Sequence, residues 1–71
     1  MMKVRISFKR VGTAIVAYAK VTGARTRDEA IVAAKDVLAR SGHQLLDPSA
    51  TPDVNLASRK GAADTVILPL R

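Results

Sequence analysis

Cysteine is absent from this chain, which excludes both a disulfide framework and a thiolate metal site. Tryptophan is absent as well, and the two aromatic residues are Phe8 and Tyr18, so we expect a thin, aliphatic core. No uninterrupted apolar run approaches the roughly 20 residues that span a bilayer. No apolar segment with a cleavage site follows the basic N-terminus either. These absences predict a cytoplasmic protein that does not enter a membrane.

Acidic side chains are missing from the first 27 residues. Seven basic side chains precede the first acid, Asp28, and they are Lys3, Arg5, Lys9, Arg10, Lys20, Arg25 and Arg27. The rest of the chain holds five basic and six acidic side chains, so these first residues account for the whole net charge of +6. A fold does not need this asymmetry, whereas a surface that contacts polyanions would use it.

Two extended segments near the N-terminus predict a β-hairpin over residues 2–22. In residues 2–9 apolar side chains alternate with polar ones, which is the pattern of a half-buried strand. Residues 13–22 are rich in strand-forming residues, and Gly12 between the two runs suits a turn. A turn over residues 10–13 sets Lys9 opposite Ala14 and Arg5 opposite Tyr18.

The same alternation predicts two unlike faces of this hairpin. One face is apolar and consists of Met2, Val4, Ile6, Phe8, Ile15, Ala17, Ala19 and Val21. The other face consists of Lys3, Arg5, Ser7, Lys9, Ala14, Val16, Tyr18 and Lys20. A slip of one residue would bury the charges, so the division into faces is strongly specified.

A helix is predicted over residues 27–41. Thr26 and Glu29 match a capping box, and Gly42 suits the position that follows a helix. Val32 and Ala39 fall on the polar side of this helix, where the pair could mark a contact with another chain. The stripe that would face the sheet consists of Ala30, Ile31, Ala34, Val37, Leu38 and Ser41.

The last third of the chain gives weaker signals. Residues 43–61 are predicted to be a loop or a short helix, and residues 43–47 are either a short strand or the chain returning to the sheet. Residues 52–60 fit a helix or a strand equally well. A final strand is predicted over residues 65–70, in which Pro69 argues for a strand end or a sheet edge. Residues 1–71 thus form one small, two-layer α+β domain in the order β-β-α-β, with a mostly antiparallel sheet.

Residues that could support catalysis are few. His43 is the only histidine, and no motif supplies it with a nucleophile and an orienting acid. Asp47 and Asp53 flank a proline-containing loop, but two carboxylates make a weak metal site. The glycines form neither a phosphate-binding loop nor a dinucleotide fingerprint. We therefore expect a protein that is not an enzyme and that holds no cofactor and no metal.

The basic side of the hairpin is the candidate binding site. It would contain Lys3, Arg5, Lys9 and Lys20, with Arg10 at the tip, Arg25 and Arg27 at the exit of the second strand, and Tyr18 as a residue that stacks on a base. Arg59, Lys60 and Arg71 form a smaller basic element that could extend it. One sheet face must be solvated in any case, but an ordinary solvated face mixes charges of both signs. The leading hypothesis is a module that binds the backbone of DNA or RNA.

Two resemblances qualify this hypothesis. Residues 21–38 resemble the last strand and closing helix of double-stranded RNA-binding domains, with a glycine, a capping threonine, an alanine pair and a leucine. That family has lysines where this chain has Asp28 and Glu29, and it has a first helix that is missing here, so we do not expect membership.

The small β-β-α-β format without an enzyme motif is also similar to phage-encoded inhibitors such as anti-CRISPR proteins. This similarity implies the alternative function, an inhibitor or adaptor that blocks an acidic protein or nucleoprotein partner. A homodimer that forms through the exposed strand edge or the side of the helix with Val32 and Ala39 is the third hypothesis.

Overall fold

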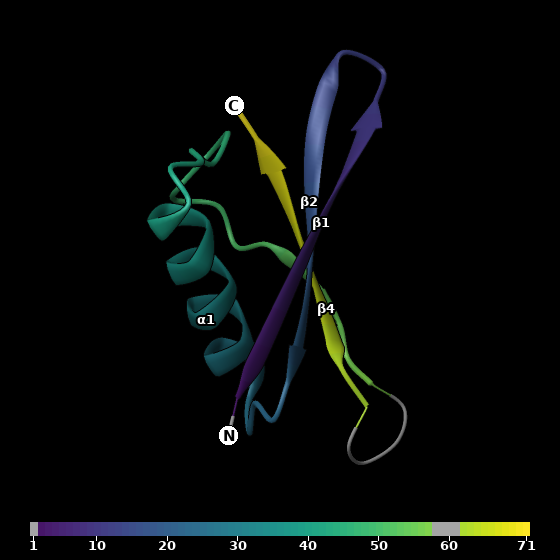
Figure 1. Ribbon diagram of the computed structural model, residues 1–71, viewed down its shortest axis with the longest axis vertical. Helices are drawn as coiled ribbons and strands as arrows, with labels where there is room; N and C mark the ends of the chain where they lie inside the picture. The colour runs from purple at the N-terminus through teal and green to yellow at the C-terminus, as the bar shows by residue number, and fades with distance from the viewer. Residues whose placement is uncertain (1, 58–61) are drawn as a thin grey trace.

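The computed structural model describes residues 2–57 and 62–71, and within them one helix lies across one face of a four-stranded antiparallel sheet (Figure 1). The elements are β1 (Lys3–Val11), β2 (Ala14–Thr22), α1 (Arg27–Arg40), β3 (Asp53–Asn55) and β4 (Asp64–Leu70). The strand order across the sheet is β1-β2-β4-β3. This arrangement confirms the predicted small α+β fold. It adds one short strand, β3, in the segment for which helix and strand were both open, and residues 58–60 of that segment lie outside the described residues.

The hairpin turn is tighter than the sequence analysis predicted. Val11 pairs with Ala14, so the turn consists of Gly12 and Thr13 alone. Gly12 has φ +63°, and among the described residues only glycines have positive φ, which fits a type II′ turn with glycine first. Such two-residue turns match the right-handed twist of the strands, and this one lets Arg10 and Val11 join the pairing of β1 with β2. The prediction that Arg10 lies at the tip is therefore wrong, since Arg10 is a β1 residue opposite Ile15.

The tighter turn shifts the pairing of β1 with β2 by two residues. Arg5 lies opposite Lys20 and Ser7 lies opposite Tyr18, so the predicted pairs of Arg5 with Tyr18 and of Lys9 with Ala14 are wrong. Side chains alternate between faces with a period of two, and a shift of two therefore leaves every residue on its predicted face. The division into two faces survives the correction, while the neighbours within each face change.

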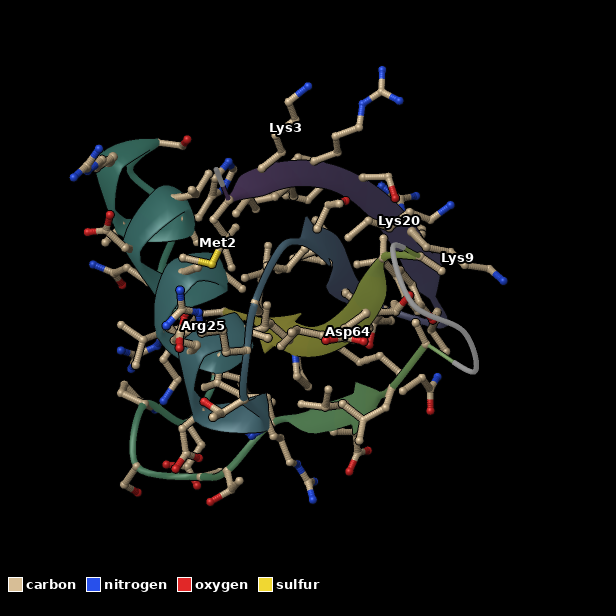
Figure 2. All side chains as sticks on the ribbon, turned by 90° about the horizontal axis from the view of Figure 1, so that it is seen from below. Met2, Lys3, Lys9, Lys20, Arg25 and Asp64 are labelled. Carbon is tan, nitrogen blue, oxygen red and sulfur yellow. The ribbon has the colours of Figure 1, made fainter. Side chains whose placement is uncertain are left out.

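The core lies between α1 and the sheet and is built largely from small residues. Its buried members are Ala17, Ala19, Val21, Ala30, Ile31, Ala34, Leu38, Val66, Leu68 and Leu70. Alanines on β2 and α1 let the helix approach the sheet closely, and Leu38 and Leu68 are the largest fully buried side chains. In the view along the long axis, α1 lies to the left of the strands and Lys9 and Lys20 lie on the opposite side (Figure 2).

The hairpin is longer than the helix that covers it. A helix of 14 residues extends about 21 Å, whereas a strand of nine residues extends about 30 Å. The hairpin therefore projects past the C-terminal end of α1 (Figure 1). Phe8 and Ile15, which were predicted to face a core, lie on this projection and are 50% and 43% exposed. Met2, at the other end of β1, is also exposed.

Both ends of α1 are capped as the sequence predicts. The Glu29 backbone N–H donates to Thr26 Oγ1 over 3.1 Å. At the other end Gly42 has φ +81°, its N–H donates to the Ala39 carbonyl, and the His43 N–H donates to the Leu38 carbonyl, which is a Schellman motif. Ser41, predicted as the last helical residue, is the C-cap.

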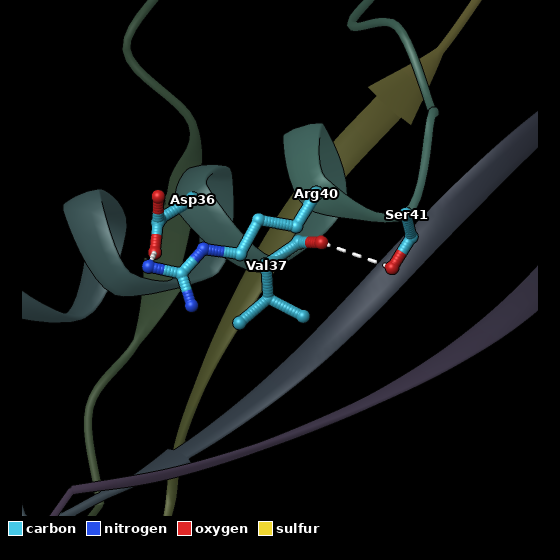
Figure 3. Close-up of polar contacts among 4 residues, drawn as sticks. All are labelled: Asp36, Val37, Arg40 and Ser41. Carbon is cyan, nitrogen blue, oxygen red and sulfur yellow. Dashed lines mark hydrogen bonds and ion pairs between the residues drawn. The ribbon is translucent and has the colours of Figure 1, made fainter.

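The last turn of α1 carries two further polar contacts. The Ser41 hydroxyl donates to the Val37 carbonyl over 3.0 Å, and the Arg40 guanidinium lies 3.1 Å from the Asp36 carboxylate (Figure 3). Both partners of this ion pair are largely exposed, so it contributes little to stability.

After α1 the chain returns to the sheet, where Leu45 and Leu46 lie beside the end of β4. Leu45 forms a single antiparallel bridge with Leu70, and the Leu46 N–H donates to the Pro69 carbonyl over 3.0 Å. In a strand the N–H and C=O of one residue point to the same side, so the N–H that Pro69 lacks would also face this segment and not β2. Pro69 pairs with Val16, next to the terminal pair of β4 with β2, which agrees with the prediction that it marks a strand end.

Candidate nucleic-acid interface: the open face of the sheet

The side of the sheet away from α1 is covered by no other element of the described chain, and we call it the open face. Its members follow from strand alternation, because the buried residues of β2 and β4 point to α1. They are Lys3, Arg5, Ser7, Lys9 and Val11 on β1; Ala14, Val16, Tyr18, Lys20 and Thr22 on β2; Thr65, Ile67 and Pro69 on β4; and Asp53 and Asn55 on β3.

Strand pairing arranges these residues in rows across the sheet. One row reads Arg5, Lys20, Thr65, Asn55, the next reads Ser7, Tyr18, Ile67, Asp53, and the third reads Lys9, Val16, Pro69. The open face therefore has three zones. Cations gather on β1 and β2, an apolar strip runs over Val16, Tyr18, Ile67 and Pro69, and the far edge on β3 is polar.

Arg5 and Lys20 are directly opposite each other in adjacent strands. Directly paired residues have Cβ atoms about 5 Å apart, and like charges in such a pair destabilise the sheet. Neither residue has a salt bridge to any residue in 2–57 or 62–71, where the pair of Arg40 and Asp36 is the one ion pair. The free protein thus holds a repulsion that a bound anion would relieve.

Two open depressions lie beside these two cations. One, of about 670 Å³, is lined by Lys3, Val4, Arg5, Lys20, Thr22 and Ala63. The other, of about 250 Å³, is lined by Arg5, Ile6, Ser7 and Lys20. Arg5 and Lys20 border both, so an anionic group could approach this cationic pair from either side.

The structure brings together some of the predicted site residues and separates others. Lys3, Arg5, Lys9, Lys20 and Tyr18 share the open face. The remaining three do not join them: Arg10 lies on the side of the sheet that faces α1, Arg25 lies in the bend after β2, and Arg27 is the first residue of α1. Figure 2 shows Arg25 next to α1, far from Lys9 and Lys20.

The smaller basic element is only partly described. Arg59 and Lys60 lie outside the described residues. Arg71 follows β4, its side chain is exposed, and its backbone N–H donates to the Gln44 carbonyl over 3.0 Å.

Several open-face residues were missed by sequence reasoning. Ile67, Thr65, Asn55 and Asp53 complete the rows that begin with the basic residues of the hairpin. Strand alternation in residues 65–70 could have placed Ile67 on one face together with Thr65. Their position next to Tyr18 and Lys20 depends on β4 pairing with β2, for which the sequence carries no local signal.

Three polar groups away from the open face have contacts within the described fold. The ring of His43 lies tilted against that of Phe8, with the ring centroids 4.9 Å apart. Asp64 accepts a hydrogen bond of 2.7 Å from the Ala57 N–H. Hydrogen bonds from the Ser49 hydroxyl and N–H lower the pKa of Asp47.

Two further observations concern metals and membranes. Within residues 2–57 and 62–71 no three His, Asp or Glu side chains are grouped closely enough to hold a metal ion. The helix that the structure describes is too short and too polar to cross a membrane.

In three comparisons with known proteins, the chain matches no protein-family model, no curated protein and no solved structure.

Proposed function

We propose that this protein is a non-enzymatic module that binds the sugar–phosphate backbone of a nucleic acid through the open face of its sheet. The observation that carries the proposal is the gathering of Lys3, Arg5, Lys9 and Lys20 on one uncovered sheet face, where no salt bridge to a described residue neutralises them. Alternate residues of a strand are nearly 7 Å apart. This distance is about two steps of a nucleic-acid strand, which rises about 3.4 Å per nucleotide along a duplex. Lys3 and Arg5 therefore match phosphates two steps apart, while Lys9, with Ser7 between it and Arg5, lies about four steps from Arg5.

Binding of this kind depends strongly on salt. Each phosphate that a cation neutralises releases counterions, and four such contacts give a log–log slope of about −2.8 with a single strand or about −3.6 with B-DNA. Affinity should then fall about 50- to 150-fold between 50 and 200 mM salt. Contacts to phosphates carry little sequence information, so modest sequence specificity is expected.

A charge-reversal experiment tests this proposal. Affinity for labelled oligonucleotides is measured at low salt by fluorescence anisotropy for the wild type and for the double variant Arg5→Glu/Lys20→Glu. The matched control is Arg25→Glu/Arg27→Glu, which changes the net charge equally but lies off the open face. We expect the first variant to lose binding and the control to keep most of it. Equal losses in both would mean that total charge, and not this face, governs binding, and no binding by the wild type would refute the function.

The alternative function, a protein-binding inhibitor or adaptor, is favoured by a different surface. A groove of about 620 Å³ runs between α1 and the start of β1. Met2, Val4, Val32 and Val37 line it together with the acidic residues Asp28, Glu29 and Asp36, so a partner that docks there would not be acidic. Val32 is 65% exposed there. This hypothesis expects a complex that survives nuclease treatment and that Val32→Lys disrupts while Arg5→Glu/Lys20→Glu does not. Persistence of the complex in Val32→Lys would exclude the groove as its interface.

A further inference from the structure

We infer that the open face takes an unpaired, single-stranded nucleic-acid segment, with the backbone over β1 and β2 and with bases over the apolar strip of Val16, Tyr18 and Ile67. This inference rests on the proposed function and specifies its ligand. It depends on the apolar strip, an observation that is independent of the charge on β1.

The apolar strip is unusual for a solvated face. The exposed side of an antiparallel sheet normally carries polar residues, while apolar ones point to the core. Here Val16, Tyr18 and Ile67 occupy the middle of the open face, and each is only half-buried; Ile67 also lines a pocket of about 170 Å³ that it shares with the segment of residues 45–52. A ligand with flat apolar surfaces would cover them.

Tyr18 is the centre of this arrangement. Its partner on β4 is Ile67, its partner on β1 is Ser7, and Val16 and Lys20 precede and follow it on the same face of β2. Paired neighbours have Cβ atoms about 5 Å away, and the neighbours along the strand are nearly 7 Å away. A base that stacks on Tyr18 thus has its own phosphate within reach of the long side chain of Lys20 or, diagonally, of Arg5.

A duplex cannot use both zones of this face. In a duplex the bases are paired and stacked on each other, so phosphates would meet the cations while the apolar strip faced the hydrated backbone. A single strand presents phosphates and unpaired bases at the same time, and base–aromatic stacking is the usual partner of cationic grooves in single-strand binding. The combination of zones therefore favours unpaired nucleic acid.

The β3 edge of the open face determines on which side the phosphates and the bases of the bound nucleic acid lie. Asp53 is opposite Ile67, and Asn55 is opposite Thr65. The carboxylate of Asp53 repels phosphate, whereas the amide and hydroxyl of the other two can pair with base edges. The backbone is therefore kept over β1 and β2, and the bases point toward β4 and β3.

The experiment uses the intrinsic fluorescence of the full chain, because Tyr18 is its only tyrosine and tryptophan is absent. Oligo-dT and oligo-U of about 10 nucleotides, within the size range of single-strand sites, are titrated at low salt. A duplex of equal charge and poly-glutamate serve as the other ligands. We expect both single strands to quench the tyrosine emission, and the duplex and poly-glutamate to leave it nearly unchanged.

Variants at Tyr18 separate stacking from charge, and because they lack the only tyrosine their binding is measured by the fluorescence anisotropy of labelled oligonucleotides. Tyr18→Leu keeps an apolar side chain but cannot stack, and it should weaken single-strand binding by about 5- to 150-fold, the range measured for loss of one stacked base. Tyr18→Phe should bind as the wild type does, and neither variant should change duplex binding. Circular dichroism and thermal melting confirm that each variant is folded.

The outcomes distinguish this inference from the function on which it rests. Equal affinity for single strand and duplex, with no effect of Tyr18→Leu, would overturn the inference but leave backbone binding intact. Poly-glutamate that competes as well as oligo-dT would also overturn it, since charge alone would then suffice. No binding of any nucleic acid would refute the proposed function itself.

Discussion

Reversing the charge of Lys20 should stabilise the fold while it weakens nucleic-acid binding. Lys20 is directly opposite Arg5, and both side chains are exposed. At about 5 Å two unit charges in water repel by about 0.8 kcal/mol. Long side chains can splay apart, which lowers this to about 0.4 kcal/mol at 10 Å. Lys20→Glu replaces the repulsion by an attraction of similar size, so the free energy of unfolding should rise by about 1 kcal/mol.

The assay is thermal unfolding followed by circular dichroism at low ionic strength. A gain of about 1 kcal/mol raises Tm by about 4–8 °C in a domain of this size. The matched control is Lys9→Glu, whose cross-strand partner is Val16 and whose alternate neighbours on β1 are Ser7 and Val11. It makes the same change in net charge without a directly paired cation, and it should change Tm much less. At 1 M salt, where the Debye length is about 3 Å, the difference between the two variants should disappear.

The refuting result is equally specific. If Lys20→Glu and Lys9→Glu shift Tm equally at low salt, the effect comes from net charge and the pairing of Arg5 with Lys20 is not a strained contact. A double-mutant cycle with Arg5→Gln and Lys20→Gln gives the coupling energy directly. A repulsive coupling at low salt that vanishes at high salt is required by the reasoning.

Three further predictions concern the scaffold of the open face. Leu38→Ala removes one of the two largest fully buried side chains and should lower the free energy of unfolding by about 2–5 kcal/mol in urea denaturation, with Val32→Ala, at an exposed site, as the near-neutral control. Thr26→Ala removes the N-cap hydroxyl and should cost about 1 kcal/mol, whereas Thr26→Ser should restore the wild-type Tm. Hydrogen bonds from Ser49 lower the pKa of Asp47, so the ionised carboxylate stabilises the fold above its ordinary pKa, and this stabilisation is lost as pH falls through the lowered pKa. Asp47→Asn should therefore reduce the fall of Tm in acid. A Tm that falls with pH as in the wild type would contradict this.

The faces of the hairpin could be predicted from sequence, but its register could not. Alternation of apolar and polar residues assigns each side chain to a face, and any shift by two residues preserves that assignment. The choice between a four-residue turn and the two-residue turn at Gly12 and Thr13 depends on how well the turn matches strand twist. Arg5 was therefore placed on the correct face but opposite Tyr18 and not Lys20.

Other features depended on contacts between distant parts of the chain. Val54 and Leu56 alternate as strand residues do, while Thr51 and Pro52 are typical of a helix start, and pairing of Val54 with Val66 decides in favour of a strand. The place of Ile67 beside Tyr18 likewise depends on the pairing of β4 with β2. Exposure of Phe8 was predictable in principle, because a helix of 14 residues is shorter than a strand of nine.

The molecule exposes more surface than is expected for a globular domain of its mass. Its accessible area is 5276 Å², against about 4,300 Å² expected from the mass of 7.6 kDa. Phe8 and Val11, near the tip of the hairpin, are 50% and 52% exposed. A hairpin shortened to the length of α1 would keep every buried residue of β2, but it would lose the pair of Lys9 and Val16 from the open face. The projecting length thus adds nothing to the core and extends the open face, which is the expected result if that face is where the protein binds its ligand.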